Sequence, residues 1–187
     1  MHISEQKSQL RDSIKERMER MSAKTRNAEE RSLCRRLREF LGTNPRTITA
    51  FVPLKDEVDI RPVLQELLEE GWRIFLPTFQ GGALAFRQAL RLDNLKPGHL
   101  NIPEPPSSSP LLDGHELDIA LVPGRAFTKK GQRLGRGNGG YDLWIAQQRK
   151  WNPRTRYVGI ALECQIVDEL PLEPHDQKLD MVLTARS

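Results

Sequence analysis

The sequence contains few cysteines and no long apolar run. Its two cysteines, Cys34 and Cys164, lie far apart in no metal-ligand spacing, which favours two reduced thiols over a disulfide or a metal site. No apolar run approaches the roughly 18 residues that a membrane helix needs, and the N-terminal residues lack the apolar region of a secretory signal. We therefore expect a soluble, cytoplasmic protein whose 187 residues form a single domain, 1–187.

Aromatic residues are also scarce, with three Trp, two Tyr and six Phe. They do not alternate with basic residues, as they would on a surface that stacks nucleic-acid bases. The formal net charge is +4, and the basic excess lies in the N-terminal arm, residues 1–38. Such an excess is compatible with nucleic acid or with a small polyanion such as a nucleotide. The composition favours the nucleotide.

The spacing of apolar residues predicts alternating helices and strands. Helices are expected over 5–21, 27–41, 59–71 and about 141–150, and strands over 47–53, 72–77, 83–89, 117–123, 156–162 and 181–185. The order between 47 and 77 is that of a βαβ unit, which implies parallel strands. We predict an α/β fold, a three-layer α/β/α sandwich with a mostly parallel, Rossmann-like open sheet.

Three local features extend this prediction. The segment 96–110 is rich in Pro and Ser and is expected to be an irregular surface loop. Asn27, with Glu30 three residues later, is expected to cap the second helix. In the first helix, Lys7, Arg11 and Lys15 recur every four residues beside the apolar stripe. They form either a solvated flank or a basic edge that faces an anion.

The stretch "RLGRGNGGYD", Arg133 to Asp142, holds four glycines and two arginines in ten residues. It follows a predicted strand and precedes a helix, where ligands bind in open α/β sheets. Glycines let consecutive N–H groups cradle a phosphate, and the helix N-terminus adds partial positive charge. Arg133 and Arg136 can add charge-assisted hydrogen bonds. The loop comes too late in the chain for a dinucleotide fingerprint. Its residues favour phosphate binding over a mobile turn, but they do not identify which phosphate-bearing ligand binds.

Carboxylates near the loop offer a metal site. Asp142 is either a helix cap or a ligand, and Asp180 precedes the last predicted strand. Mg²⁺ that carries nucleotide phosphates takes one or two carboxylates plus water, so this pair would suffice if the two segments meet. His175 is interpreted as a solvated loop residue. Because no nucleophile with a partner base is visible, the pattern indicates catalysis by positioning and charge, as in phosphoryl transfer.

Four stretches carry a family resemblance. They are "KSQLR" (7–11), "FVPLKDEVDIRPVL" (51–64), "VPGRAFTKKGQRLGRGNGGYD" (122–142) and "YVGIALECQIVDELPLEPHDQKLDMVLT" (157–184). Together they resemble the 5-formyltetrahydrofolate cyclo-ligase, or methenyltetrahydrofolate synthetase, family. The resemblance implies an ATP- and Mg²⁺-dependent enzyme that converts 5-formyltetrahydrofolate to 5,10-methenyltetrahydrofolate with release of ADP and phosphate. It implies that ATP phosphorylates the formyl oxygen, after which N10 attacks the activated carbon.

The resemblance also implies the site residues. For ATP they are Lys7, Arg11, Arg133, Leu134, Gly135, Arg136, Gly137, Asn138, Gly139, Gly140 and Tyr141. For the folate they are Val52, Glu57, Arg136, Gly137, Asn138, Gly139 and Gly140. Asp142 and Asp180 would bind Mg²⁺. Glu57 suits the pterin because a carboxylate can accept paired N–H bonds from an aminopterin ring.

The loop departs from the family pattern at one position. The usual ending G-x-G-Y-Y-D reads "GNGGYD" here, so Gly140 replaces the first tyrosine. This leaves an alternative, a divergent relative that binds a nucleotide or RNA, or acts on another formyl compound. We expect a monomer whose partners are 5-formyltetrahydrofolate and ATP, without a membrane or nucleic-acid partner.

Overall fold

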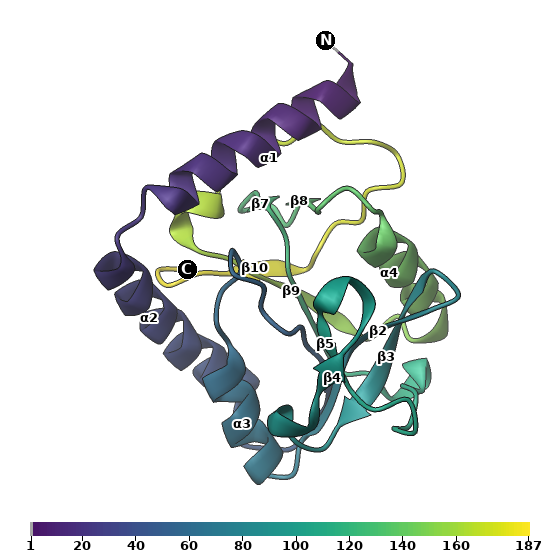
Figure 1. The fold of residues 1–187 in the computed structure, drawn as a ribbon. Coiled ribbons are helices and arrows are strands. Elements are labelled where there is room, and N and C mark those ends of the chain that lie inside the picture. The colour runs from purple at the N-terminus through teal and green to yellow at the C-terminus, as the bar shows by residue number, and fades with distance from the viewer. Residues whose placement is uncertain (1) are drawn as a thin grey trace.

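The computed structural model describes residues 2–187, apart from the side chain of Leu100. A six-stranded sheet forms its centre, with the strand order β10-β9-β6-β1-β2-β3 (Figure 1). The strands are β1 (Thr47–Thr49), β2 (Arg73–Gln80), β3 (Ala83–Ala89), β6 (Ile119–Val122), β9 (Arg156–Ile160) and β10 (Met181–Leu183). Neighbouring strands are parallel except β2 and β3, which form an antiparallel hairpin. The sheet is therefore mostly parallel, as the sequence predicts.

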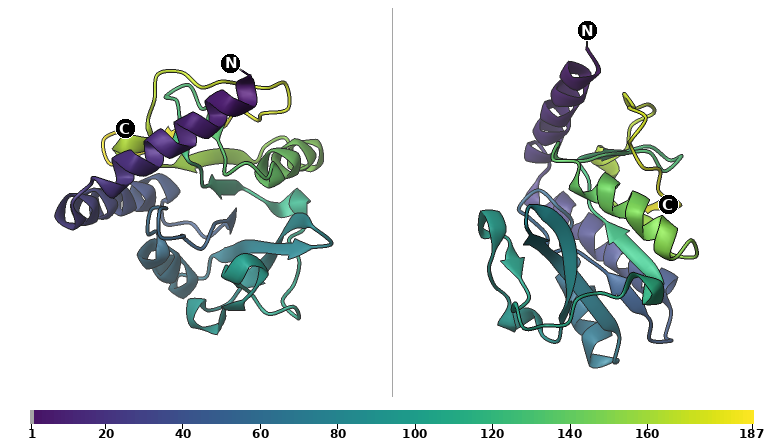
Figure 2. Two further views of the ribbon diagram at one scale, coloured as in Figure 1. Left: turned by 45° about the horizontal axis from the view of Figure 1, so that its top comes forward. Right: turned by 90° about the vertical axis from the view of Figure 1, so that its right-hand side faces the viewer.

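Helices cover both faces of this sheet. Helices α2 (Ala23–Leu41) and α3 (Arg61–Glu69) pack on one face, where Leu37 and Leu64 join the larger apolar core. Helix α4 (Gly140–Trp151) packs on the other face, where Trp144 and Ile145 join a second apolar cluster (Figure 2). Every residue of β6 is buried, as expected of a strand between two helical layers. The prediction of an α/β fold with three layers is confirmed.

Helix α1 (Ile3–Glu19) lies differently. It crosses the carboxyl ends of the strands and contacts β7 (Ala126–Phe127) and the short 3₁₀ helix η4 (Glu163–Gln165), which follow β6 and β9 (Figure 1). Its apolar residues Ile14 and Met18 are buried in the core, and Lys7 on an adjacent side is buried as well. The N-terminal helix thus brings its basic edge to the end of the sheet where ligands bind in this class of fold.

Two local predictions were wrong. Helix α2 begins at Ala23, because Ser22 precedes it and its hydroxyl accepts a hydrogen bond from the Thr25 amide at 3.1 Å. Asn27 lies inside the helix and does not cap it. The segment 96–110 is not wholly irregular, since β4 (Lys96–Pro97) pairs with β5 (Pro103–Glu104) around the 3₁₀ turn η2 (His99–Asn101). The 3₁₀ turns η1 (Leu92–Asn94) and η3 (Gly114–Glu116) flank it.

A small ribbon that the sequence analysis did not find leads into the glycine-rich loop. Strand β8 (Arg133–Leu134) pairs antiparallel with β7, and Gly131 makes the turn between them with φ of +87°. The Gly131 carbonyl accepts a hydrogen bond from Leu179 N at 2.8 Å. This contact fixes the ribbon against the C-terminal segment. None of the helices within residues 2–187 is long and apolar enough to cross a membrane.

We predict that Gly131→Ala lowers the free energy of unfolding by roughly 2–4 kcal/mol, because it adds left-handed strain and a clash. A Cβ at this position would lie 2.3 Å from the Leu179 carbonyl oxygen. The matched control is Gly140→Ala, whose Cβ would meet nothing nearer than 3.7 Å and which needs no positive φ. We expect this control to stay within about 1 kcal/mol of the parent. Urea unfolding measures both, and equal losses would contradict the prediction.

Candidate active site

A pocket of about 190 Å³ opens at the carboxyl ends of the parallel strands. Its walls come from helix α1, the loop after β1, the glycine-rich loop and the segment 173–176. All of the residues that the sequence assigns to ATP or to the folate line this pocket, and so does Asp142. The fold therefore gathers residues from both ends of the chain around one cavity.

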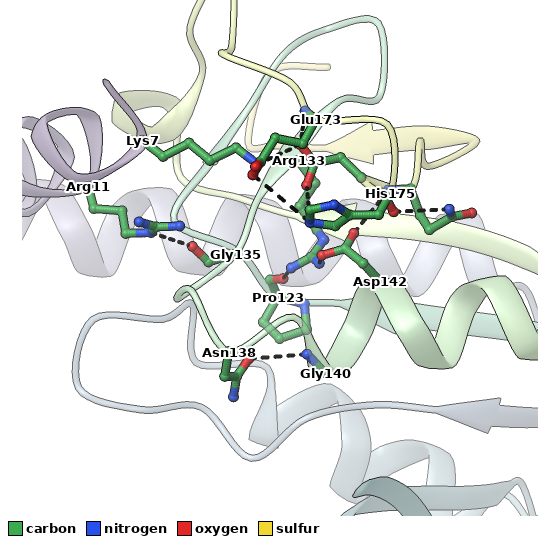
Figure 3. Close-up of polar contacts among 12 residues, drawn as sticks. Lys7, Arg11, Pro123, Arg133, Gly135, Asn138, Gly140, Asp142, Glu173 and His175 are labelled. Carbon is green, nitrogen blue, oxygen red and sulfur yellow. Dashed lines mark hydrogen bonds and ion pairs between the residues drawn. The ribbon is translucent and has the colours of Figure 1, made fainter. Parts of the chain in front are cut away.

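The glycine-rich loop needs some of its glycines and not others. Gly137 and Gly139 have φ of +109° and +67°, backbone conformations that residues other than glycine rarely adopt. A Cβ at Gly137 would face the Arg11 guanidinium, 3.6 Å away. The Arg11 Nε donates to the Gly135 carbonyl at 2.8 Å (Figure 3). Helix α1 therefore holds a cation directly against bare loop backbone, which is the arrangement that suits a phosphate.

Gly140 has no such backbone requirement. A Cβ there would have ordinary contacts, with the Leu84 Cβ at 3.7 Å and the Asn138 Oδ1 at 3.8 Å. Gly140 also borders a neighbouring cavity of about 320 Å³, which shares Phe79 and Asn138 with the main pocket. The missing side chain thus leaves space beside the pocket, and the fold does not demand a glycine here.

A buried ion pair lies beneath the loop. Arg133 Nη2 donates to Asp142 Oδ2 at 2.8 Å, with side chains only 3% and 11% exposed (Figure 3). Arg133 also donates to the Pro123 carbonyl and lies over the Tyr141 ring. Asp142 Oδ1 accepts from the Gln177 amide at 3.0 Å, so the pair joins β8, α4 and the C-terminal segment. Asp142 makes no cap bond for α4, whose N-cap is Gly139, and the interpretation as a helix cap was wrong.

Lys7 is paired with two acids from the other end of the chain. Its Nζ donates to Asp176 Oδ2 at 2.6 Å and to Glu173 Oε2 at 2.7 Å, and its side chain is 8% exposed (Figure 3). The alternative of a solvated flank is therefore wrong for Lys7. Burial acts to lower the pKa of Lys7, but the bonds to Asp176 and Glu173 outweigh it and raise the pKa above its usual value.

The same contacts act on the acids. Burial acts to raise the pKa of Asp176, but bonds from Lys7 and from the Glu173 amide outweigh it, and the pKa lies below its ordinary value. The bond from Lys7 likewise lowers the pKa of Glu173. Both acids are therefore ionised at neutral pH. His175, between them in sequence, has a largely exposed side chain, yet it also lines the pocket.

A third set of charges crosses the pocket. Arg136, in the glycine-rich loop, donates to Glu57 Oε1 from Nε at 3.2 Å and from Nη2 at 3.1 Å. The same Nη2 donates to Asp56 Oδ1, and Arg125 donates to Asp56 Oδ2. Glu57 Oε2 accepts from the Leu54 amide at 3.0 Å, so both oxygens of this carboxylate are occupied.

The structure does not bring Asp180 into the pocket. Its Oδ2 accepts from the Tyr157 amide at 2.7 Å, and its amide donates to the Tyr157 carbonyl at 2.9 Å. These contacts lie where β9 and β10 begin, whereas the pocket lies where the strands end. Asp176, four residues earlier in the same motif, lines the pocket with Asp142. The predicted pair of Asp142 and Asp180 is not formed because the register of β10 turns Asp180 away.

The pocket therefore holds several cations, each paired with an acid or a carbonyl of the chain. A polyanion can enter by replacing the acids on these cations, and the acids released can then accept N–H groups or bind a divalent cation. In the part of the chain that the structure describes, no nucleophile with a partner base lines the cavity. The geometry suits reactions driven by positioning and charge.

Comparisons with known proteins agree with one another. Residues 3–185 match the model of the family described as the 5-formyltetrahydrofolate cyclo-ligase family. A 5-formyltetrahydrofolate cyclo-ligase of Mycolicibacterium smegmatis is 31% identical, over 96% of this chain and 94% of that protein. One from Escherichia coli K12 is 34% identical, over 74% of this chain and 77% of that protein.

Solved structures give the same result. The NMR structure of Aquifex aeolicus 5,10-methenyltetrahydrofolate synthetase has a TM-score of 0.81 at 27% identity, and covers 97% of this chain and 90% of that one. The structure of a 5,10-methenyltetrahydrofolate synthetase from Mycoplasma pneumoniae has a TM-score of 0.76 at 23% identity, with 96% and 98% covered. The second likeness shows the shared fold.

We predict that the Lys7 ion pairs stabilise the protein in a pH-dependent way. The acids have lowered pKa values in the folded state, so their stabilisation is present above their unfolded pKa, about 4, and is lost as the pH falls through the folded values. The melting temperature of Lys7→Met should therefore lie below that of the parent at pH 7, and the difference should shrink below pH 4. Thermal unfolding across this range tests it. A difference that stays constant with pH would contradict the assignment.

Proposed function

The chain belongs to the 5-formyltetrahydrofolate cyclo-ligase family, and we propose how its pocket carries out this family's reaction. The protein is a 5-formyltetrahydrofolate cyclo-ligase, which uses ATP to convert 5-formyltetrahydrofolate to 5,10-methenyltetrahydrofolate. One observation supports the proposed mechanism above the others. A single cavity is lined by a buried lysine, a bare-backbone loop and a carboxylate on the facing wall.

The proposed ATP site lies between α1 and the glycine-rich loop. Lys7 and Arg11 reach the phosphates from the helix, and the amides of Gly137 to Gly140 approach from the loop. The N-terminus of α4 adds its partial positive charge. For this to happen, the phosphates must replace Glu173 and Asp176 on Lys7. A triphosphate carries more negative charge than those two carboxylates together, which favours the exchange.

Mg²⁺ fits Asp176, which this exchange releases, together with Asp142. We place it at Asp142 and Asp176, because both carboxylates line the phosphate end of the pocket and carboxylate oxygen is the ligand Mg²⁺ prefers. Each acid is paired with a cation in this structure, Asp142 with Arg133 and Asp176 with Lys7. Those cations would turn toward the phosphates. When bound, Mg²⁺ neutralises charge on the phosphate oxygens during transfer.

The proposed folate site is the opposite wall. Glu57, beside Val52, accepts N–H bonds from the pterin ring, and the loop from Arg136 to Gly140 lies along the formyl side. Because Gly140 stands where the family pattern has a tyrosine, a ring is missing there and the space beside Gly140 is free. The formyl group and the terminal phosphate of ATP then meet between this wall and the glycine-rich loop.

The reaction follows in two steps. The formyl oxygen attacks the terminal phosphorus of ATP, a new P–O bond forms, and the bond to ADP breaks. N10 then attacks the formyl carbon and loses its proton, while the C–O bond breaks and phosphate leaves. Lys7, Arg11 and Arg136 stabilise the negative charge that moves from the transferred group to ADP. The residues bind and orient both substrates, and the leaving group is supplied by ATP. A monomeric state, a cytoplasmic location and the absence of nucleic-acid partners stay predictions.

We predict that the purified protein forms the methenyl chromophore from 5-formyltetrahydrofolate only when ATP and Mg²⁺ are both present. Asp142→Asn should lower kcat by about 100-fold or more, since it removes a proposed metal ligand and uncovers a buried arginine charge. The absorbance of the product measures the rate directly. Turnover by the parent without nucleotide would contradict the function, and full turnover by Asp142→Asn would contradict the metal site alone.

We also predict that Lys7→Met raises the KM for ATP by about 10- to 100-fold, the cost of one charge-assisted hydrogen bond to phosphate. The KM for the folate should change far less, because Lys7 lies at the nucleotide end. The control is Lys15→Met on the same helix, whose side chain is 62% exposed and pairs only loosely with Glu19. Steady-state kinetics should show no change for this control. A similar rise for both variants would mean that general charge, and not a specific contact, attracts ATP.

A further inference from the structure

Asp56 joins two arginines at the edge of the pocket. One carboxylate oxygen accepts from Arg125 and the other from Arg136. The side chain of Asp56 is 29% exposed, and that of Arg125 is 17% exposed. Asp56 does not itself line the pocket, so its effect on a bound ligand must act through the arginines that it holds.

The arginines around Asp56 repel one another. The pKa of Arg125 is lowered first by burial and then by the charges of Arg136 and Arg11. Within residues 2–187, the acidic side chains that form ion pairs with these three arginines are Asp56 and Glu57. Arg11 instead donates to the Gly135 carbonyl. Because Arg125 and Arg136 share the Asp56 carboxylate, removing its charge changes where the more mobile of these two cations goes. Arg136 is that cation, since its side chain is 33% exposed and comes from the loop.

Glu57 cannot serve Arg136 and the folate at once. Its Oε1 accepts both bonds from Arg136, and its Oε2 accepts from Leu54 N. A pterin that donates paired N–H groups to both oxygens of this carboxylate must displace the guanidinium from Oε1. Arg136 can then keep one strong partner only if Asp56 remains, because the Nη2 group already reaches Asp56.

We propose that Asp56 is a positioning residue of the folate site: it holds Arg136 beside the pocket when the substrate takes Glu57. The inference rests on the proposed roles of Glu57 and Arg136. Asp56 gives Arg136 a second anchor, so that the guanidinium stays at the edge of the pocket when the pterin replaces it on Glu57. Without the negative charge of Asp56, Glu57 becomes the main partner of Arg136, and Arg136 then competes with the pterin for this carboxylate.

The test is Asp56→Asn, which keeps the shape of the side chain and removes its charge. The KM for 5-formyltetrahydrofolate should rise about tenfold, the cost of displacing one charged hydrogen bond. The KM for ATP should fall or stay unchanged, because a negative charge near the triphosphate has been removed. If Asp56 had a purely structural role, the substitution would weaken the binding of both substrates or lower the melting temperature. A rise in the folate KM without a rise in the ATP KM is therefore the diagnostic result.

Two further variants sharpen the test. Asp93→Asn removes the exposed Arg91–Asp93 pair on the surface and should change neither KM. In an Arg136→Gln background, Asp56→Asn should change the folate KM by less than about twofold, because the competing cation is gone. Asp56→Glu, which restores the charge, should recover most of the folate affinity.

The outcomes separate the inference from the function on which it rests. If the parent forms no methenyl product with ATP, the proposed function itself is wrong. If the parent is active but Asp56→Asn leaves the folate KM unchanged, or raises both KM values alike, Asp56 is not a positioning residue. An equal effect of Asp56→Asn with and without Arg136 would also overturn it, since Arg136 would then not be the group through which Asp56 acts.

Discussion

Ion pairing between buried cations and the chain's own acids is the interaction on which this pocket depends. A charge taken out of water is stable only when it is paired and hydrogen-bonded. Lys7 and Arg133 are almost fully buried, and each has a carboxylate within 3 Å. The acids on Lys7 come from the other end of the sequence, so this pairing also closes the pocket between the first helix and the last loop.

These pairs fit a site that binds a highly charged nucleotide. The carboxylates accept hydrogen bonds from the same N–H groups that phosphates would use. They therefore hold the cations in place and keep them paired before a nucleotide binds. When phosphates replace these carboxylates, the buried cations stay paired with an anion before and after the exchange. In the proposed mechanism, the acids that are displaced become available for Mg²⁺ at one end and for the pterin at the other. One set of contacts thus stabilises the fold and prepares the site for both substrates.

The site residues differ in how far the sequence could reveal them. The glycine-rich loop was predictable because its function resides in local backbone, and its spacing and flanking elements are visible in a single stretch. The basic edge of α1 was visible too, but helical spacing alone could not decide whether it faces solvent. The sequence could not tell Asp180 from Asp176, because both lie in one short motif and only the register of β10 decides which of them faces the pocket. Asp56 gave no local signal, since its partner Arg136 lies 80 residues away.

The sequence by itself determined the alternation of strands and helices, the mostly parallel sheet and the bare backbone of the glycine-rich loop, because apolar periodicity and glycine content act over short distances. The tertiary structure decided which charged and polar groups meet. Lys7 with Asp176, Arg136 with Glu57 and Asp142 with Gln177 are contacts between segments that only the sheet brings together. Electrostatic interactions depend on separation in space and on burial, and neither quantity is written in the order of residues along the chain.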